Sequence, residues 1–117
     1  MLKIGLTSIT LRQYSVDEII TLSANAGIQG IEWGSDIHVP PGDIQLAKSV
    51  KAKTEAAGLS VCAYGSYYKC DDATVPFADY LNSAHALGAP FIRVWAGTKG
   101  SESSQTERDE VAQCLRH

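Results

Sequence analysis

Basic clusters and long apolar runs are both missing from this 117-residue sequence. No apolar stretch approaches the ~20 residues that a helix needs to cross a bilayer, and the opening MLKIGLTS turns polar too early for a secretory signal peptide. The net charge is −3, and lysines and arginines do not form a run. Nucleic acid and an anionic membrane surface are therefore not expected as partners, because both attract clustered positive charge.

Cysteine is scarce as well. Cys62, Cys70 and Cys114 are the three cysteines, and they form no C-x-x-C pair. This usage argues against a disulfide framework and indicates a reducing compartment, so we predict a cytoplasmic protein. Cys62 falls within a predicted strand, and we expect it to be a small core residue rather than a metal ligand.

The sequence does contain a repeat with a period near thirty residues. The segments ANAGIQGIEW, EAAGLSVCAY and HALGAPFIRVW each read as a helix end, a glycine and a strand. Gly27, Gly58 and Gly88 are 31 and 30 residues apart, and glycine after a helix suits the left-handed conformation that ends many helices. The repeat indicates one domain of four consecutive βα units, at about 1–27, 28–58, 59–88 and 89–117.

Capping residues locate the helices between the predicted strands. Ser15 with Glu18 and Ser104 with Glu107 have the spacing of capping boxes, and we predict single caps at Asp43 and Thr74. Apolar residues follow each start at helical spacing. Strands that alternate with helices at this pace are parallel with right-handed crossovers. We predict these strands at about 2–8, 29–34, 59–64 and 90–96.

The alternation within the strands distinguishes two parallel folds. Four βα units could form an open α/β sheet or half of an eight-unit barrel. One face of every predicted strand is aliphatic, whereas the other is small, polar or aromatic. An open sheet with helices on both sides needs aliphatic residues on both faces, but a barrel has one face against helices and one toward its axis. The pattern therefore favours the N-terminal half of a (β/α)8 TIM barrel.

Two opposite charges are predicted on the axis side of this sheet. Glu32 lies in the second strand and Arg93 in the fourth, both on the polar face. Inward residues of alternate strands share a layer in such barrels, and a buried carboxylate requires a partner. We predict an ion pair between them. The pair could plug the barrel as a structural element, hold a substrate, or do both.

Further candidate residues lie at the strand exits. The active sites of parallel barrels are built at the carboxyl ends of the strands. Trp95 is one inward position beyond Arg93, Tyr64 holds the matching position on the third strand, and Asp36 and His38 follow the second. Each has an alternative that involves no ligand: Trp95 would only pack at the barrel mouth, and His38 would be an ordinary solvated loop residue.

The segments GIEWGSDIHVPPGD, VCAYGSYY and LGAPFIRVWAGTKGSE resemble the sugar phosphate isomerase/epimerase family, the xylose-isomerase-like TIM barrels. The resemblance extends over 1–117. It implies isomerisation or epimerisation of a small sugar by proton transfer beside a carbonyl. It also implies a divalent metal (Mn, Mg, Co or Zn) bound by two Glu, one Asp and one His.

The family's metal ligands follow its fifth to eighth strands, so the resemblance places none of them in this chain. A full barrel takes ~250 residues, and 117 residues are less than half of that. We therefore expect the N-terminal half of such an enzyme, without metal and without activity when alone. The matching positions form the opposite, substrate-facing wall of the pocket; they are Glu32, His38, Tyr64, Arg93 and Trp95, and no catalytic residue is assigned.

Two alternatives remain open. A non-catalytic half-barrel would expose its strand edges and inner face and so favour assembly into a homo-oligomer. An apurinic-endonuclease-type phosphodiesterase would need a basic surface and additional histidines at the third and fourth strand exits, where the sequence has YGSYY and VWAG. Which sugar is bound, and whether it is phosphorylated, is also left open.

Overall fold

Four parallel strands alternate with four helices, as the repeat predicts. The computed structural model describes residues 2–70, 74–98, 100 and 102–116. The sheet has the order β1-β2-β3-β4, with every neighbouring pair parallel. The elements are β1 (Gly5–Thr7), a 3-10 helix η1 (Ser8–Leu11), α1 (Val16–Asn25), β2 (Gly30–Gly34), α2 (Ile44–Ala56), β3 (Ser60–Lys69), α3 (Phe77–Leu87), β4 (Ile92–Trp95) and α4 (Gln105–Arg116).

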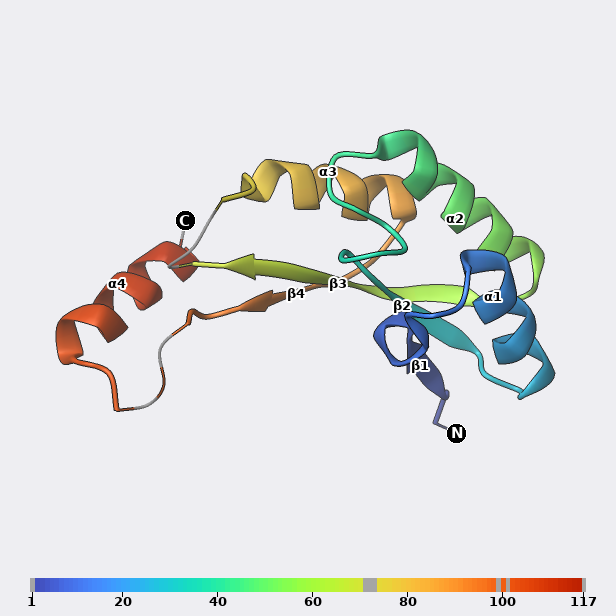
Figure 1. Ribbon diagram of the computed structural model, residues 1–117, viewed down its shortest axis with the longest axis horizontal. Helices are drawn as coiled ribbons and strands as arrows, with labels where there is room; N and C mark the ends of the chain where they lie inside the picture. Colours follow the sequence, from blue (N-terminus) through green and yellow to red (C-terminus); the bar gives the residue numbers. More distant parts are fainter. Residues whose placement is uncertain (1, 71–73, 99, 101, 117) are drawn as a thin grey trace.

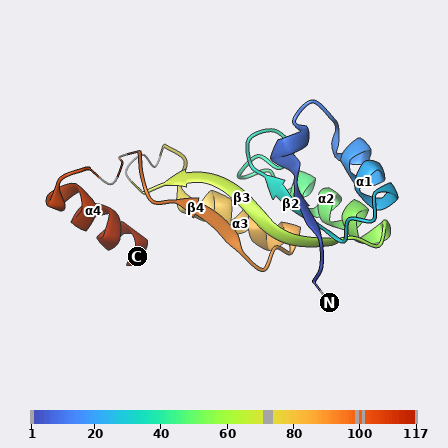
Figure 2. The ribbon, with the colours of Figure 1, turned by 90° about the horizontal axis from the view of Figure 1, so that it is seen from below.

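The helices cover the sheet on one side. In Figure 1, α2 and α3 lie above the sheet and α1 lies at its right-hand end, beside α2. Figure 2, seen from below, shows β3 and β4 in front of α3 and of part of α2. The α4 helix lies beyond the ends of β3 and β4 instead of packing back over the sheet (Figure 1). The open side of the sheet is here called the concave face. Glu32, Arg93 and Trp95 lie on it, as expected from the sequence, whereas Tyr64 does not.

The hydrophobic core lies between the sheet and the three covering helices. Ile31 and Trp33 of β2 point into it and are fully buried, together with Val50 of α2 and Leu87 of α3. The indole Nε1–H of Trp33 donates to the Thr54 hydroxyl at 3.1 Å, which satisfies the polar end of the ring inside the core. None of the described helices is both long and apolar enough to cross a membrane.

Three of the four predicted helix starts are confirmed. Ser15 forms a complete capping box with Glu18, and Ser104 and Glu107 exchange the corresponding bonds at the start of α4. The Asp43 carboxylate accepts from the Leu46 amide at 3.1 Å. The predicted cap at Thr74 is wrong. The α3 helix begins only after Pro76, whose extended backbone (ψ 139°) keeps the preceding chain out of the helix.

The first strand is shorter than predicted. β1 covers three residues instead of 2–8, and Leu2 and Ile4 are 93% and 60% exposed. This strand is an edge of the described sheet, so its early residues have a neighbour on one side and gain little burial. The chain then turns directly into η1, which the sequence analysis did not predict.

The third strand is longer than predicted and contains a register shift. Ile31 pairs with Val61, but the next β2 residue, Glu32, pairs with Ala63, so Cys62 is the additional residue of a β-bulge. The bulge exposes Cys62 instead of burying it in the core. It also exchanges the two faces for the residues directly after it, and this corrects the predicted orientation of Tyr64. A second irregularity lies between Gly65 and Lys69, which pair with Arg93 and Trp95 of β4.

Candidate functional site

An ion pair lies at the centre of the concave face. The Arg93 guanidinium donates to Glu32 Oε1 from Nε at 3.3 Å and from Nη2 at 3.1 Å. The two side chains are only 37% and 21% exposed, so the charges are partly withdrawn from water. The predicted pairing of these residues, two strands apart, is therefore confirmed. Two donors on one oxygen fix the guanidinium plane relative to the carboxylate.

Two small residues, Thr7 and Gly65, adjoin this pair. The Thr7 hydroxyl at the end of β1 donates to the same Glu32 oxygen at 3.2 Å. Gly65 of β3 lies beneath the pair: a Cβ at this position would be 2.9 Å from Arg93 Nη2 and 2.9 Å from Glu32 Oε1. Any larger residue at position 65 would have to displace the ion pair. The sequence did not identify either residue, although Thr7 lies on the small and polar face of the first predicted strand.

An aromatic pair adjoins the guanidinium. The Trp95 and Tyr67 rings are stacked, with centroids 6.4 Å apart and planes inclined by 19°. Trp95 Nε1–H donates to the Ser66 carbonyl at 3.1 Å, and Arg93 Cζ lies 5.4 Å from the Trp95 ring centre. The indole is 42% exposed, so part of its face remains available to a ligand. The bulge places Tyr67 on the concave face, and for this reason the sequence did not identify it.

A second guanidinium joins the strand exits to this aromatic pair. Arg12, just after η1, donates from Nε to the Asp36 carboxylate and from Nη2 to the Tyr67 hydroxyl. The hydrogen bond with Asp36 is the largest cause that raises the pKa of Arg12. Asp36 lies in the loop after β2, where the sequence analysis had noted it. Arg12 therefore connects the segments that follow β1 and β2 with the outer part of β3.

These contacts form one continuous group at the carboxyl ends of the strands, which we call the mouth cluster. It combines two guanidiniums, two carboxylates, two hydroxyls and an aromatic pair. Such a surface can donate hydrogen bonds to ligand oxygens and offer a ring face to C–H groups. Its members are Thr7, Arg12, Glu32, Asp36, Tyr67, Arg93 and Trp95.

His38 is not brought into the mouth cluster. Its ring is 4% exposed and lies edge-on to Trp33, with centroids 5.9 Å apart. Nε2 is 2.8 Å from the Tyr14 carbonyl and Nδ1 is 3.2 Å from the Ser8 hydroxyl. Since a carbonyl only accepts, Nε2 carries the proton and Nδ1 accepts from Ser8 in the neutral ring. Both nitrogens hold the loop after β2 against η1.

Tyr64 lies on the opposite side of the sheet from the predicted one. Its side chain is fully buried under α3, beside Tyr80, and its hydroxyl donates to the Val39 carbonyl at 2.7 Å. Burial is the main cause that raises the pKa of Tyr64. The predicted position on the substrate-facing wall is wrong, because the bulge at Cys62 reverses the alternation before Tyr64.

The described residues do not fit the metal centre that the resemblance implies. No group of three or more His, Cys, Asp or Glu side chains comes together within the described ranges. The acidic and histidine side chains of the second strand and its loop also have other partners: Glu32 pairs with Arg93, Asp36 with Arg12, and His38 with Ser8 and Tyr14. No chemical step at a metal is therefore assigned to this chain.

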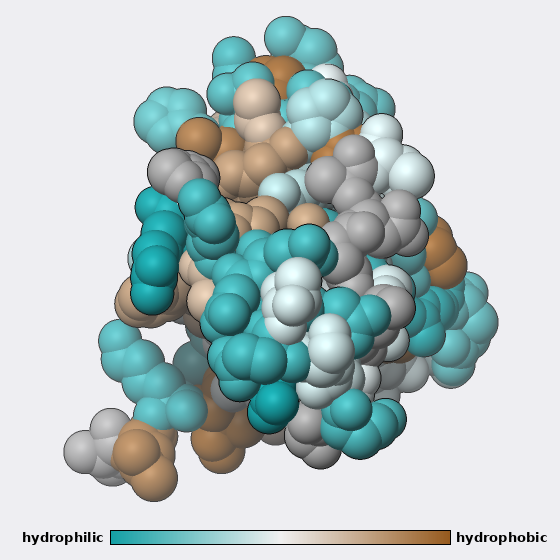
Figure 3. Space-filling model, turned by 90° about the vertical axis from the view of Figure 1, so that its left-hand side faces the viewer, coloured by the Kyte–Doolittle hydropathy of each residue, from teal (hydrophilic) through white to brown (hydrophobic). Residues whose placement is uncertain are grey.

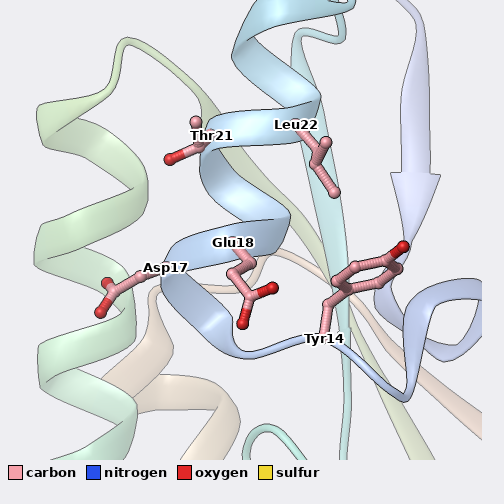
Figure 4. Close-up of a pocket in the computed structure, with 5 residues that line it drawn as sticks. All are labelled: Tyr14, Asp17, Glu18, Thr21 and Leu22. Atoms are coloured by element: carbon pink, nitrogen blue, oxygen red, sulfur yellow. The ribbon is translucent and has the colours of Figure 1, made fainter.

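A separate hollow lies on the outer surface beside α1. It has a volume of about 350 Å³ and is lined by Tyr14, Asp17, Glu18, Thr21 and Leu22. Figure 4 shows that four of these side chains come from one helix and that Tyr14 lies across from Leu22. None of the lining residues belongs to the mouth cluster. Asp17 is also engaged in an ion pair with Lys53 of α2.

Comparisons with known proteins agree on the fold. No family model and no curated protein matches the sequence. Among solved structures, a putative xylose isomerase from Rhodospirillum rubrum superimposes with a TM-score of 0.77 at 14% identity, over 99% of this chain and 47% of that one. A xylose isomerase domain protein from Planctomyces limnophilus gives 0.66 at 17% identity, over 97% and 47%.

A third structure is the probable 3-DHS dehydratase AsbF involved in petrobactin synthesis from Bacillus anthracis. It has a TM-score of 0.75 and 22% identity, over 98% of this chain and 46% of its own. The chain thus spans about half the length of each of these three solved structures. Its four parallel βα units have the fold of the N-terminal half of a xylose-isomerase-like TIM barrel.

Proposed function

We propose that this chain supplies the substrate-facing wall of a metal-dependent sugar isomerase or epimerase, and that the metal ligands belong to a complementary half-barrel. The observation that carries the proposal is the mouth cluster at the carboxyl ends of the strands, where parallel barrels bind their ligands. Two of the matched structures are described as xylose isomerase proteins, which supports a small sugar, free or phosphorylated, as the substrate class. In the complete enzyme, the divalent metal would polarise the sugar's oxygens during proton transfer.

The residues of this chain have a binding and orienting role in this proposal. Arg93 and Arg12 donate hydrogen bonds to the oxygens of the sugar, and Glu32 accepts from a hydroxyl through Oε2. The exposed face of Trp95 packs against the C–H side of the ring and excludes water there. Contacts of this kind place the reacting carbons, while the proton transfer itself takes place against groups of the other half.

Tryptophan fluorescence provides the test, because the two tryptophans differ in environment. Trp95 is 42% exposed in the mouth cluster, whereas Trp33 is fully buried in the core. Titration of the chain with D-xylose, D-fructose and their phosphates should give a saturable change in emission with at least one of them. Arg93→Ala should weaken this binding at least about tenfold, equivalent to 1.4 kcal/mol.

Trp95→Phe is the matched control, since Trp33 is then the remaining reporter. The saturable signal should disappear in that variant. A signal that persists in Trp95→Phe, or the absence of saturation with every sugar tested, would overturn the assignment of this surface as a sugar-binding wall.

A second candidate function is a non-catalytic half-barrel that assembles with copies of itself. Phe91 is 71% exposed and Trp95 42% exposed, both on or beside β4. β1 and β4 are the edges of the described sheet, and open edges pair readily with other strands. We therefore propose that the isolated chain forms a homo-oligomer through its edges and concave face.

A further inference from the structure

Two of the three cysteines meet in a hollow between the sheet and the last helix. The hollow has a volume of about 300 Å³ and is lined by Tyr68, Cys70, Phe77, Val94, Cys114 and Leu115. Cys70 follows β3 directly, and Cys114 lies in the last turn of α4. Residues separated by 44 positions in sequence thus bring their thiols to one apolar site. Neither the proposed sugar-binding wall nor the hydrophobic core uses these thiols.

A tyrosine lines the same hollow as the two thiols. Tyr68 Oη lies 3.7 Å from Cys114 Sγ. The hydrogen bond with Cys114 is the largest cause that raises the pKa of Tyr68, and the charge of Cys70 contributes in the same direction. Tyr68 thus contacts Cys114 inside the hollow that Cys70 also lines. Both cysteines are partly exposed, so a small reagent in solution can reach them.

The position of α4 indicates what a bond between these cysteines would do. Every residue of α4 is described, and none of them is buried. Figure 1 places the helix beyond the strand ends, away from α1–α3, and Figure 3, viewed from that side, shows a largely hydrophilic surface. The hollow is the place where the apolar side of α4 meets β3 and β4. A covalent link there would fix the helix to the end of the sheet.

We propose that Cys70 and Cys114 are a thiol–disulfide exchange pair whose substrate is a small disulfide such as oxidised glutathione. One thiolate attacks a sulfur of glutathione disulfide, which forms a mixed disulfide and releases one glutathione thiolate. The second protein thiolate then attacks the protein sulfur of the mixed disulfide and releases the second glutathione. Two protein thiols become one disulfide while one glutathione disulfide becomes two glutathione molecules, so electrons and protons balance.

Cys62 is an internal control for this reaction. It lies in the first part of β3, at the bulge, and lines a different part of the molecule from the hollow. Its side chain is exposed, and it does not line the hollow that Cys70 and Cys114 share. It should therefore take no part in a protein disulfide while the other two cysteines form one.

The experiment equilibrates the purified chain with oxidised and reduced glutathione, quenches with acid, and counts thiols. The folded chain should lose two of its three thiols and two hydrogens in mass, and peptide mapping should join residues 70 and 114. Cys62→Ser should react in the same way. Cys70→Ser and Cys114→Ser should each stop at the glutathione mixed disulfide.

Unfolding the chain tests whether the disulfide forms because the fold brings Cys70 and Cys114 together. In concentrated urea, the equilibrium constant for closing the disulfide should fall at least about tenfold, because the two thiols lose their shared site. Retention of all three thiols, a bond that involves Cys62, or an equilibrium constant unchanged by urea would each overturn the proposal. Loss of the Cys70 and Cys114 thiols in the folded chain, with a bond between these two residues, supports the proposal.

Discussion

At the scale of single residues, the charge within β2 is explained by its partners. A carboxylate in a sheet loses hydration and must recover it from donors nearby. Glu32 receives three: two N–H groups of Arg93 and the Thr7 hydroxyl, all on Oε1. Gly65 leaves the space in which they meet. The pair therefore has both a structural role in the sheet and an exposed edge that a ligand can reach.

Removing one partner of this pair should show how much the pair contributes to the unfolding free energy. Arg93→Ala leaves a carboxylate that is only 21% exposed without its cation. The expected loss is about 1–2 kcal/mol of unfolding free energy, between the values for exposed and fully buried pairs. Urea denaturation of the wild type, Arg93→Ala, Glu32→Gln and the double variant measures it. In the double variant the losses should not add, because the two groups interact directly.

The matched control is the ion pair between Lys53 and Asp17 on the helix surface. Its side chains are 49% and 71% exposed, so water screens the attraction. Lys53→Ala should change the unfolding free energy by less than about 0.5 kcal/mol. If Lys53→Ala lowers the unfolding free energy as much as Arg93→Ala does, the partial burial of Glu32 and Arg93 in the concave face adds no stability.

The buried phenol of Tyr64 predicts a loss of stability at alkaline pH. Burial raises its pKa in the folded chain, so the folded state retains a proton that the unfolded state has lost above about pH 10. The stabilisation is complete below pH 10 and falls as the pH rises toward the folded pKa. Urea midpoints measured from pH 8 to 11 should therefore decrease.

Tyr64→Phe tests the origin of this decrease. The variant should lose about 1 kcal/mol at pH 8, because the hydrogen bond to the Val39 carbonyl is removed. Its stability should then fall less steeply above pH 10. The pKa values of Tyr68 and Tyr80 are also raised, so some slope should remain. An alkaline slope identical to that of the wild type would contradict the assignment to Tyr64.

At the scale of elements, α2 is held to β2 by a buried polar contact as well as by packing. The Trp33 indole donates to Thr54 Oγ1, and the Thr54 hydroxyl donates to the Val50 carbonyl of the preceding turn. Both Trp33 and Thr54 are fully buried. The threonine thus satisfies an indole N–H that neither strand nor helix backbone reaches.

Thr54→Val should separate this contact from simple packing, since valine has nearly the same shape. The Trp33 N–H would lose its acceptor inside the core, with an expected cost of about 1–3 kcal/mol. Thr21→Val on the exposed side of α1 is the control and should cost less than about 0.5 kcal/mol. Equal effects in urea denaturation would show that the buried hydrogen bond is not important for docking α2.

At the scale of the whole molecule, the sheet is open where a closed barrel would continue. β1 and β4 are the edges of the described sheet, and its concave face carries partly exposed aromatic rings. Burial of such surface is worth roughly 25 cal/mol per Å². A second copy placed edge to edge would pair the strands and cover the concave face at the same time.

We expect the isolated chain to be at least dimeric at tens of micromolar, with a mass above 12.5 kDa by light scattering. Phe91→Lys places a charge beside the β4 edge and should shift the equilibrium toward monomer, because edge charges oppose strand pairing. A folded, monodisperse monomer of the wild-type chain at these concentrations would show that the open face needs no partner.

The sequence by itself determined the order of elements, the parallel sheet and the ion pair. Glycine after each of the first three helices, capping boxes at Ser15 and Ser104, and two-residue alternation act locally, so they can be read without coordinates. Glu32 and Arg93 were predictable because each lies on a short, regular strand, where parity alone fixes the face.

Only the tertiary structure decided which residues of β3 face the concave side. The bulge at Cys62 depends on how β3 pairs with β2, and one additional residue exchanges both faces beyond it. This buried Tyr64, brought Tyr67 beside Trp95, and gave Arg12 a partner 55 positions away. Likewise, the contacts of the His38 ring with the Ser8 hydroxyl and the Tyr14 carbonyl keep it away from the mouth cluster. Register and long-range hydrogen bonds are properties of the assembled sheet, because neighbouring strands select them together.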